Sequence, residues 1–367
     1  MRLGDIMNFY KDTDLPIDIK YDKEMIQLLI TANKLYTKFS TMLQYLDVDP
    51  LVLLKPFILQ ESFKSCELTG NTTPQASLYF IKYQQPTKQI EDIMNYYHIL
   101  LNIEQYLSNR FNLSVSYLHA IHKDLFKYSD IKMPKIGKYR DKETWIGARG
   151  RSMYEAEYIP PHPLDVPVLM GNYIKHFNKN YSLDKMIDIA VSHAQFENIH
   201  PYKDGNGRLG RILIPIQAYL QTTSLVSLFM SDMIKENQYM YFSKLKDTRN
   251  GKWESYINFF LKMMTEQLEK HVKILDDVIE IYKKDQPVYF ELIKQKNSEK
   301  VFHYMFSNIV TTIKEASETL KIDYQTMRNY CNKLHNKGIL SKQKISNGEY
   351  VYIYTKLYTK HVPVDWL

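Results

Sequence analysis

The sequence has 367 residues, of which 44% are hydrophobic, and its formal net charge is +7. This length exceeds one typical domain, and the composition is normal for a globular protein with a real core, so we expect two or three domains. The charge is mild for the length. It fits a nucleotide or nucleic-acid partner and, equally well, a solvated surface with no anionic partner.

The sequence contains two cysteines, Cys66 and Cys331, without a CxxC pair or a Cys/His cluster. This pattern argues against a disulfide framework or a structural zinc site, and it fits a reducing compartment. The N-terminal segment has no long apolar stretch, which argues against a signal peptide. The apolar runs are far shorter than the ~20 residues that a membrane span needs. We therefore expect a cytoplasmic protein.

Apolar residues at steps of three and four predict a mainly helical chain. Pro56 is expected in the first turn of the second helix, where a missing N–H is harmless. The cluster at 69–74 should end that helix. In chain order, the predicted helices are 22–44, 56–68, 88–109, 113–128, 183–198, 207–220 and 256–282.

Residues 132–167 differ in character because prolines and glycines interrupt any long helix. Within them, Tyr139–Gly147 and Ala156–Pro160 bracket a short segment that we expect to form a hairpin. Loops of this kind on a rigid scaffold often carry function. From composition alone, a plain connector is equally consistent.

The C-terminal part predicts a helix, a turn and a second helix over 311–340, followed by a strand over 349–355. Ser346-Asn-Gly before the strand is a hairpin turn signal. This unit resembles a winged helix. Its recognition-helix candidate, Tyr324 to Asn336, has few basic residues, so DNA binding and protein contacts or dimerisation are equally consistent with it.

The most informative segment is His200-Pro-Tyr-Lys-Asp-Gly-Asn-Gly-Arg-Leu-Gly-Arg211. Gly205-Asn-Gly207 directly before a helix suits a phosphate, because its backbone N–H groups and the helix N-terminus attract anions. Arg208 and Arg211, three residues apart, can grip phosphate oxygens. Asp204 supplies the one carboxylate that Mg²⁺ needs beside phosphates and water. His200 can accept a proton from a hydroxyl nucleophile.

Each of these features also has an ordinary interpretation. Asp-Gly-Asn-Gly is most often a turn, a lone histidine usually packs or lies on the surface, and two arginines in a first helical turn are often solvated. Their occurrence together at fixed offsets favours a phosphate-handling site.

This segment resembles the signature of the Fic family, His-x-Phe-x-Asp/Glu-Gly-Asn-Gly-Arg-x-x-Arg, with Tyr202 in place of the Phe. The flanking segments 192–200, 137–147 and 158–167 also resemble the family, and the similarity covers most of residues 20–265. The resemblance implies a helical bundle with a short β-hairpin flap. It also implies transfer of AMP from ATP to a protein hydroxyl, with release of pyrophosphate.

The resemblance assigns a role to each residue of the loop. His200 would be the catalytic base that deprotonates a Ser, Thr or Tyr of a target protein. Asp204 would hold Mg²⁺ at the phosphates of ATP. The nucleotide-binding residues would be Asp204, Gly205, Asn206, Gly207, Arg208 and Arg211.

The same resemblance makes the region from Trp145 to Pro161 a flap that clamps the target segment by strand-like pairing. The flap residues would be Trp145, Ile146, Gly147 and Tyr158. The implied partner is a protein with a hydroxyl side chain, and this chain itself is one candidate. A homodimer is a family expectation, and no membrane partner is expected.

Many Fic proteins carry an inhibitory helix, Ser/Thr-x-x-x-Glu-Gly/Asn, whose Glu pairs with the second arginine of the loop. Ser65, Thr69, Gly70 and Asn71 fit this element, but Thr69 stands where the Glu belongs. Since Thr69 has no charge to pair with Arg211, we expect ATP binding without strong self-inhibition. The alternative is a capped helix end with no regulatory role.

These observations predict a mainly α protein with a small α+β unit at its C-terminus. The expected domains are a helical region at 1–110 with the inhibitory-helix-like segment at 56–71, a Fic core at 111–265, a linker at 266–286 and a winged helix at 287–367. Two other functions stay open. One is a DNA-binding regulator whose Fic domain senses nucleotide, and the other is transfer of a different phosphate-containing group.

Overall fold

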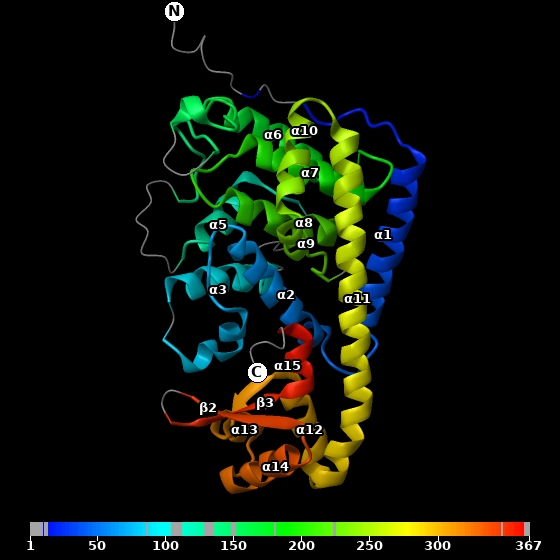
Figure 1. Cartoon of the computed structure of the whole chain (residues 1–367), viewed down its shortest axis with the longest axis vertical. Coiled ribbons are helices and arrows are strands. Elements are labelled where there is room, and N and C mark those ends of the chain that lie inside the picture. The colour runs from blue at the N-terminus through cyan, green and yellow to red at the C-terminus, as the bar shows by residue number, and fades with distance from the viewer. Residues whose placement is uncertain are drawn as a thin grey trace, which may run out of the picture. The chain divides into compact units, whose positions relative to one another are not determined.

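The computed structural model describes residues 10, 14–85, 87–103, 112–127, 136–147, 152–179, 181–222, 225–345 and 348–362. Helices dominate these residues, together with one three-stranded antiparallel sheet. All elements except β1 and the 3₁₀ helices η2 and η3 are labelled in Figure 1. In chain order they are α1 (Lys23–Met42), α2 (Pro50–Glu67), η2 (Gln75–Tyr83), α3 (Lys88–Leu101), α5 (Val115–Asp124), η3 (Met153–Glu155), α6 (Val166–Phe177), α7 (Lys185–Ile199), α8 (Asn206–Thr222), α9 (Ser231–Glu236), α10 (Gln238–Arg249), α11 (Trp253–Leu292), α12 (Gln295–Ser307), β1 (Val310–Thr312), α13 (Ile313–Leu320), α14 (Tyr324–Asn336), β2 (Leu340–Lys344), β3 (Tyr350–Tyr354) and α15 (Thr355–His361).

The chain divides into two compact units. The first comprises residues 1–37, 61–71 and 91–268, and the second comprises 38–60, 72–90 and 269–367. Helices α2 and α11 each contribute residues to both units. The units are therefore built from interleaved stretches of sequence.

Helix α7 is the centre of the first unit. Every residue from Met186 to Ile199 is buried, including the polar Ser192, His193 and Glu197. A helix buried on all sides must lie inside a bundle, and α6 and α8 pack directly against it. The sequence pattern predicted a helix with one apolar face. Its polar residues are instead buried, and several form hydrogen bonds with side chains of neighbouring helices.

The ends of α7 are fixed by local chemistry. Asp184 caps its start by accepting a hydrogen bond from the N–H of Met186 at 2.8 Å. The other oxygen of this carboxylate accepts a bond from Asn33 of α1 at 2.8 Å. At the other end the backbone of His200 turns into the left-handed region, with φ +50°. A residue in this conformation stops the helix and redirects the chain.

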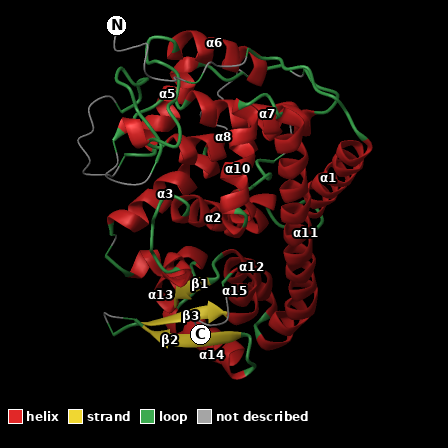
Figure 2. Cartoon of the chain, turned by 45° about the horizontal axis from the view of Figure 1, so that its top comes forward, coloured by secondary structure: helices red, strands yellow, loops and turns green. Residues whose placement is uncertain are grey.

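The sheet lies in the second unit, with strand order β1-β3-β2 (yellow in Figure 2). Val310 and Ser341 both lie opposite Ile353 of the central strand. Thr312 and Glu315 form a capping box at the start of α13, which is a strong N-terminal signal. The helices and strands that suggested a winged helix are thus present, while Ser346 and Asn347 lie outside the described residues.

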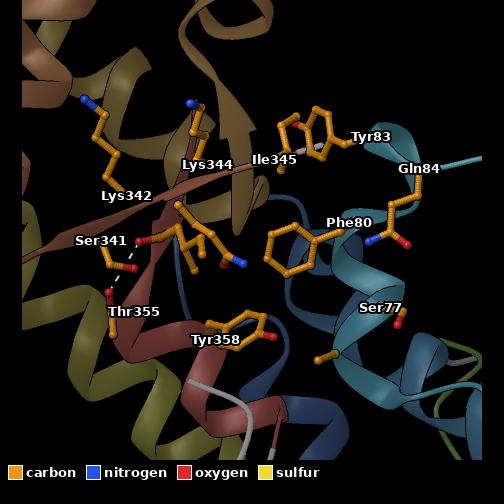
Figure 3. Close-up of a pocket in the computed structure, with 13 residues that line it drawn as sticks. Ser77, Phe80, Tyr83, Gln84, Ser341, Lys342, Lys344, Ile345, Thr355 and Tyr358 are labelled. Carbon is orange, nitrogen blue, oxygen red and sulfur yellow. Dashed lines mark hydrogen bonds between the residues drawn. The ribbon is translucent and has the colours of Figure 1, made fainter. Parts of the chain in front are cut away.

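A cavity of about 900 Å³ lies within the second unit, between η2 and the strands β2 and β3. Figure 3 shows Phe80 of η2 and Tyr358 of α15 on its wall, with Ser341 and Thr355 nearby. The rings of Phe80 and Tyr358 meet edge to face at 6.4 Å. This cavity contains none of the residues of the motif at 200–211.

Two predicted helix boundaries were wrong. Helix α2 begins at Pro50, so Pro56 lies inside it, and α11 continues to Leu292 through Pro287. In both cases burial of the flanking residues, such as Phe57 and Tyr289, offsets the lost backbone bond. No helix within the described ranges is long and apolar enough to cross a membrane.

Candidate active site

The motif at 200–211 forms the six-residue loop 200–205 that follows α7 and the first turns of α8. Asn206 closes this loop with its side chain. Its Oδ1 accepts from the N–H of Tyr202 and its Nδ2 donates to the carbonyl of Tyr202, both at 2.8 Å. Gly205 has φ +78°, and a Cβ there would lie 3.0 Å from the ring of Phe126. Only glycine satisfies both conditions at little cost.

An aromatic and histidine layer supports the loop. The ring of Tyr202 stacks on His122 at 3.9 Å, and its hydroxyl pairs with Nδ1 of His119 at 2.9 Å. His122 Nδ1 accepts from the N–H of Gly137 at 2.9 Å, so its Nε2 carries the proton and donates to the carbonyl of Asp204 at 3.0 Å. Burial lowers the pKa of His122 to about 4, which keeps this ring neutral.

Arg140 fastens the C-terminal end of α7. Its Nε donates to the carbonyl of His200 at 2.9 Å, and its Nη2 donates to the carbonyls of Pro161 at 2.5 Å and Ile199 at 3.4 Å. A buried cation at a helix C-terminus is stabilised by the free carbonyls there. Arg140 precedes the 146–158 segment and Pro161 follows it, so the hydrogen bonds of Arg140 connect both ends of this segment to the backbone of His200.

His200 is held where it can act as a base. Burial is the main cause that lowers its pKa from 6.5 to about 4, and the neighbouring Arg140 and Arg249 act in the same direction. The Asp204 carboxylate acts in the opposite direction. The imidazole is therefore neutral at pH 7 and can accept a proton.

The two arginines of the motif reach different neighbours. Arg208 lies 3.5 Å from a carboxylate oxygen of Asp92 and 4.9 Å from the centre of the Phe126 ring. Arg211 is buried and donates from Nε to the hydroxyl of Ser65 at 2.8 Å and from Nη2 to its carbonyl at 2.9 Å. Helix α2 thus bonds directly to the second arginine, through a serine.

The other residues of the inhibitory-helix-like segment form the turn that follows α2. The hydroxyl of Thr69 donates to the carbonyl of Cys66 at 2.8 Å, and the N–H of Asn71 donates to the same carbonyl at 3.1 Å. Gly70 has φ +91°. Helix α2 ends at Glu67, so Thr69 lies just beyond it.

Two buried carboxylates lie near Arg211. Glu61 accepts from the N–H of Ser231 at 2.9 Å and from the hydroxyl of Tyr96 at 3.1 Å. Glu197 packs so closely against α8 that a Cβ on Gly210 would lie 2.3 Å from its Oε1. Burial raises the pKa of both carboxyls, and the charge of Arg211 opposes this rise. Burial therefore favours the neutral form of both carboxyls, and Arg211 favours their ionised form.

The predicted flap is present as a two-residue pairing. The N–H of Ile146 donates to the carbonyl of Tyr158 at 2.9 Å, and the N–H of Tyr158 donates back at 3.1 Å. Trp145 is 45% exposed and lines a cavity of about 560 Å³ that also includes Lys203 of the loop. Gly147 follows Ile146 at the edge of the described segment. The flap and the loop therefore border one space.

The sequence did not single out His119, His122, Arg140, Glu197 and Arg249 as parts of the site. One signal could have found two of them, because His119 and His122 are three residues apart on a predicted helix, which places them on one face. The arginines gave no such signal, because their partners are backbone carbonyls and side chains far away in the sequence.

Comparisons with known proteins agree with this geometry. Residues 112–218 match the model of the Fic/DOC family. A probable protein adenylyltransferase from Aquifex aeolicus is 26% identical over 196 residues, which are 52% of this chain and 55% of that protein. The protein adenylyltransferase Fic of Drosophila melanogaster is 22% identical over 61% of this chain and 44% of that protein. The chain thus spans about half the length of these curated relatives, or less.

Solved structures show the same fold. A Fic family protein from Desulfovibrio desulfuricans superposes with a TM-score of 0.60 at 15% identity, covering 92% of this chain and 97% of that one. A Fic domain containing signaling protein from Bacteroides thetaiotaomicron gives 0.53 at 18% identity, over 67% and 98%. These solved structures share the helical fold of this chain, in which the Gly-Asn-Gly loop lies between α7 and α8. Residues 112–218 of the chain form a Fic/DOC family domain.

The contact between Gly210 and Glu197 predicts an asymmetry between two glycine substitutions. Gly210→Ala should lower the free energy of unfolding by about 1–3 kcal/mol, because the methyl group overlaps the Glu197 carboxylate. Gly171→Ala in α6, where nothing lies within 4 Å of the new Cβ, should raise it by about 0.5–1 kcal/mol through helix propensity. Urea titration of both variants checks this, and equal effects would contradict the packing described.

Proposed function

We propose that the chain is a protein adenylyltransferase, which moves AMP from Mg-ATP to a Ser, Thr or Tyr hydroxyl of a target protein. The single observation that carries the proposal is a neutral His200 at the rim of a Gly-Asn-Gly loop that opens α8. The relatives from Aquifex aeolicus and Drosophila melanogaster carry the name adenylyltransferase, which supports the same chemistry at the level of the family.

In the proposed reaction, the target hydroxyl oxygen attacks the α-phosphorus of ATP. The bond from that phosphorus to the oxygen bridging to the β-phosphate breaks, and pyrophosphate leaves. The imidazole of His200 takes the hydroxyl proton. The N–H groups of the loop from Gly205 to Gly207 would cradle the phosphates, and Arg208 and Arg211 would offset negative charge at their far end. Positioning and electrostatics supply most of the acceleration.

The loop fits a magnesium ion that arrives with the nucleotide. Asp204 is exposed, and its Oδ1 accepts from the N–H of Gly205 at 2.6 Å. Among the described residues, no group of three His, Cys, Asp or Glu side chains could form a cage of protein ligands. One carboxylate is enough for Mg²⁺ held mostly by phosphates and water. When bound, the ion would neutralise phosphate charge.

Arg211 would have to leave Ser65, at least in part, to meet the phosphates. Breaking two hydrogen bonds from a charged group costs about 1.5–3 kcal/mol each before new bonds form. The phosphate oxygens offer stronger, charge-assisted bonds in return. In this proposal the hydrogen bonds from Arg211 to Ser65 are weaker than the salt bridge that a Glu at position 69 would form.

The catalytic role of His200 can be tested directly. With α-labelled ATP, Mg²⁺ and a cell lysate, the parent protein should label target bands, and His200→Ala should reduce the labelling at least about a hundredfold. Nucleotide binding, measured by calorimetry with a non-hydrolysable ATP analogue, should be unchanged in the variant. Equal labelling by both proteins would rule out His200 as the base.

The low pKa of His200 predicts a flat pH profile. Because a base must be unprotonated, and this one loses its proton near pH 4, transfer at saturating ATP should stay level from about pH 8 to pH 6. It should fall only as the pH approaches the pKa. Initial rates across this range, with ATP affinity measured at each pH, provide the test, and a loss centred near 6.5 would contradict it.

A glutamate at position 69 should inhibit AMP transfer. Thr69→Glu would offer Arg211 a charged partner from the turn after α2, and we expect AMP transfer to fall about tenfold or more. Thr69→Gln, of the same shape but uncharged, is the matched control and should keep most of the activity. If the Glu variant labels targets as fast as the parent, the segment has no inhibitory role.

A further inference from the structure

The flap and the C-terminal end of α7 are joined by an arginine that lies outside both. Arg249, the last residue of α10, donates from Nε to Oδ1 of Asn198 at 2.8 Å. Its guanidinium carbon lies 3.4 Å from the centre of the Tyr158 ring. One planar group thus contacts the flap on its face and the end of α7 at its edge.

Asn198 is the point where these contacts converge. The Nδ2 of Asn198 donates to the hydroxyl of Thr248 at 2.9 Å. The backbone carbonyl of Asn198 accepts a hydrogen bond from the hydroxyl of Tyr158. Asn198 and Thr248 are fully buried. Asn198 stands two residues before His200, so the position of this side chain and that of the base depend on the same helical turn.

We propose that Arg249 is a positioning residue, which holds Tyr158 of the flap against the end of α7 and so sets where a target segment lies relative to His200. The inference rests on the proposed function, because it specifies how that site places its protein substrate. A mispositioning of about 1 Å between reacting groups is enough to cost a large part of a catalysed rate.

The geometry explains why this residue is an arginine. The edge of the guanidinium donates a hydrogen bond to Asn198, while its face lies over the ring of Tyr158. Only a planar cation can make both contacts at once. A lysine would keep the charge and lose this combination. Arg249, Arg140 and Asp204 are the charged groups that influence His200, the two arginines favouring its neutral form and the carboxylate opposing them.

Two substitutions separate geometry from charge. Arg249→Met removes both contacts and the charge, whereas Arg249→Lys keeps the charge. Lys246→Met is the matched control: it removes one positive charge from an exposed position in the same last turn of α10. All variants are made in the full chain and compared below their unfolding temperatures.

The first readout is hydrogen exchange at the amides of Ile146 and Tyr158, which bond each other across the flap. Arg249→Met and Arg249→Lys should both speed this exchange about tenfold, and Lys246→Met should leave it unchanged. The second readout is an NMR titration of His200, assigned by its absence in His200→Ala. Arg249→Met should raise the pKa of His200, while Arg249→Lys should not.

AMP transfer from α-labelled ATP to lysate proteins completes the test. Arg249→Lys should lower it at least about tenfold, although the charge state of His200 is kept. Parent-like exchange and parent-like transfer in Arg249→Lys would overturn the proposal. If the parent itself transfers no AMP, the proposed function fails, but the exchange and titration results still decide whether Arg249 positions the flap.

Discussion

The side-chain amide of Asn206 is the contact on which the site depends. By bonding both polar groups of the Tyr202 backbone, it fixes the six residues between two buried helices in one conformation. His200 ends the first helix in a left-handed conformation, and Gly205 turns the chain into the second. The backbone N–H groups at the start of α8 therefore keep their direction without a ligand, which lowers the cost of ordering when a phosphate binds.

The buried arginines around this loop lie beside carbonyl, hydroxyl and carboxyl groups. Arg211 contacts Ser65 directly, with Glu61 and Glu197 as neighbouring carboxylates. Removing one partner from such a group leaves an uncompensated buried charge, which costs more than the pair contributes. The region around Arg211 is thus a single electrostatic unit, and α2, α7 and α8 are coupled through it.

The sequence allowed the motif, the central helix pair and the C-terminal helices to be predicted, because each depends on local signals. Helix α14 was predicted with the bounds that the structure gives it. The partners of Arg140, Arg211 and Arg249 could not be predicted, since they lie in distant segments and include backbone carbonyls that any residue carries. The boundaries at Pro56 and Pro287 failed because tertiary burial outweighed the local preference of proline.

Tyr202 stands where the Fic signature has Phe, and its hydroxyl has a specific partner in His119. A buried hydroxyl without a partner is costly, whereas a paired one is nearly neutral. A Tyr at this position therefore needs a hydrogen-bonding partner within reach, and in this chain helix α5 supplies it. In relatives with Tyr here we expect a hydrogen-bonding residue at the position of His119, and in relatives with Phe we expect no such requirement. Substitutions in α5 should therefore disturb the layer of rings that supports the loop.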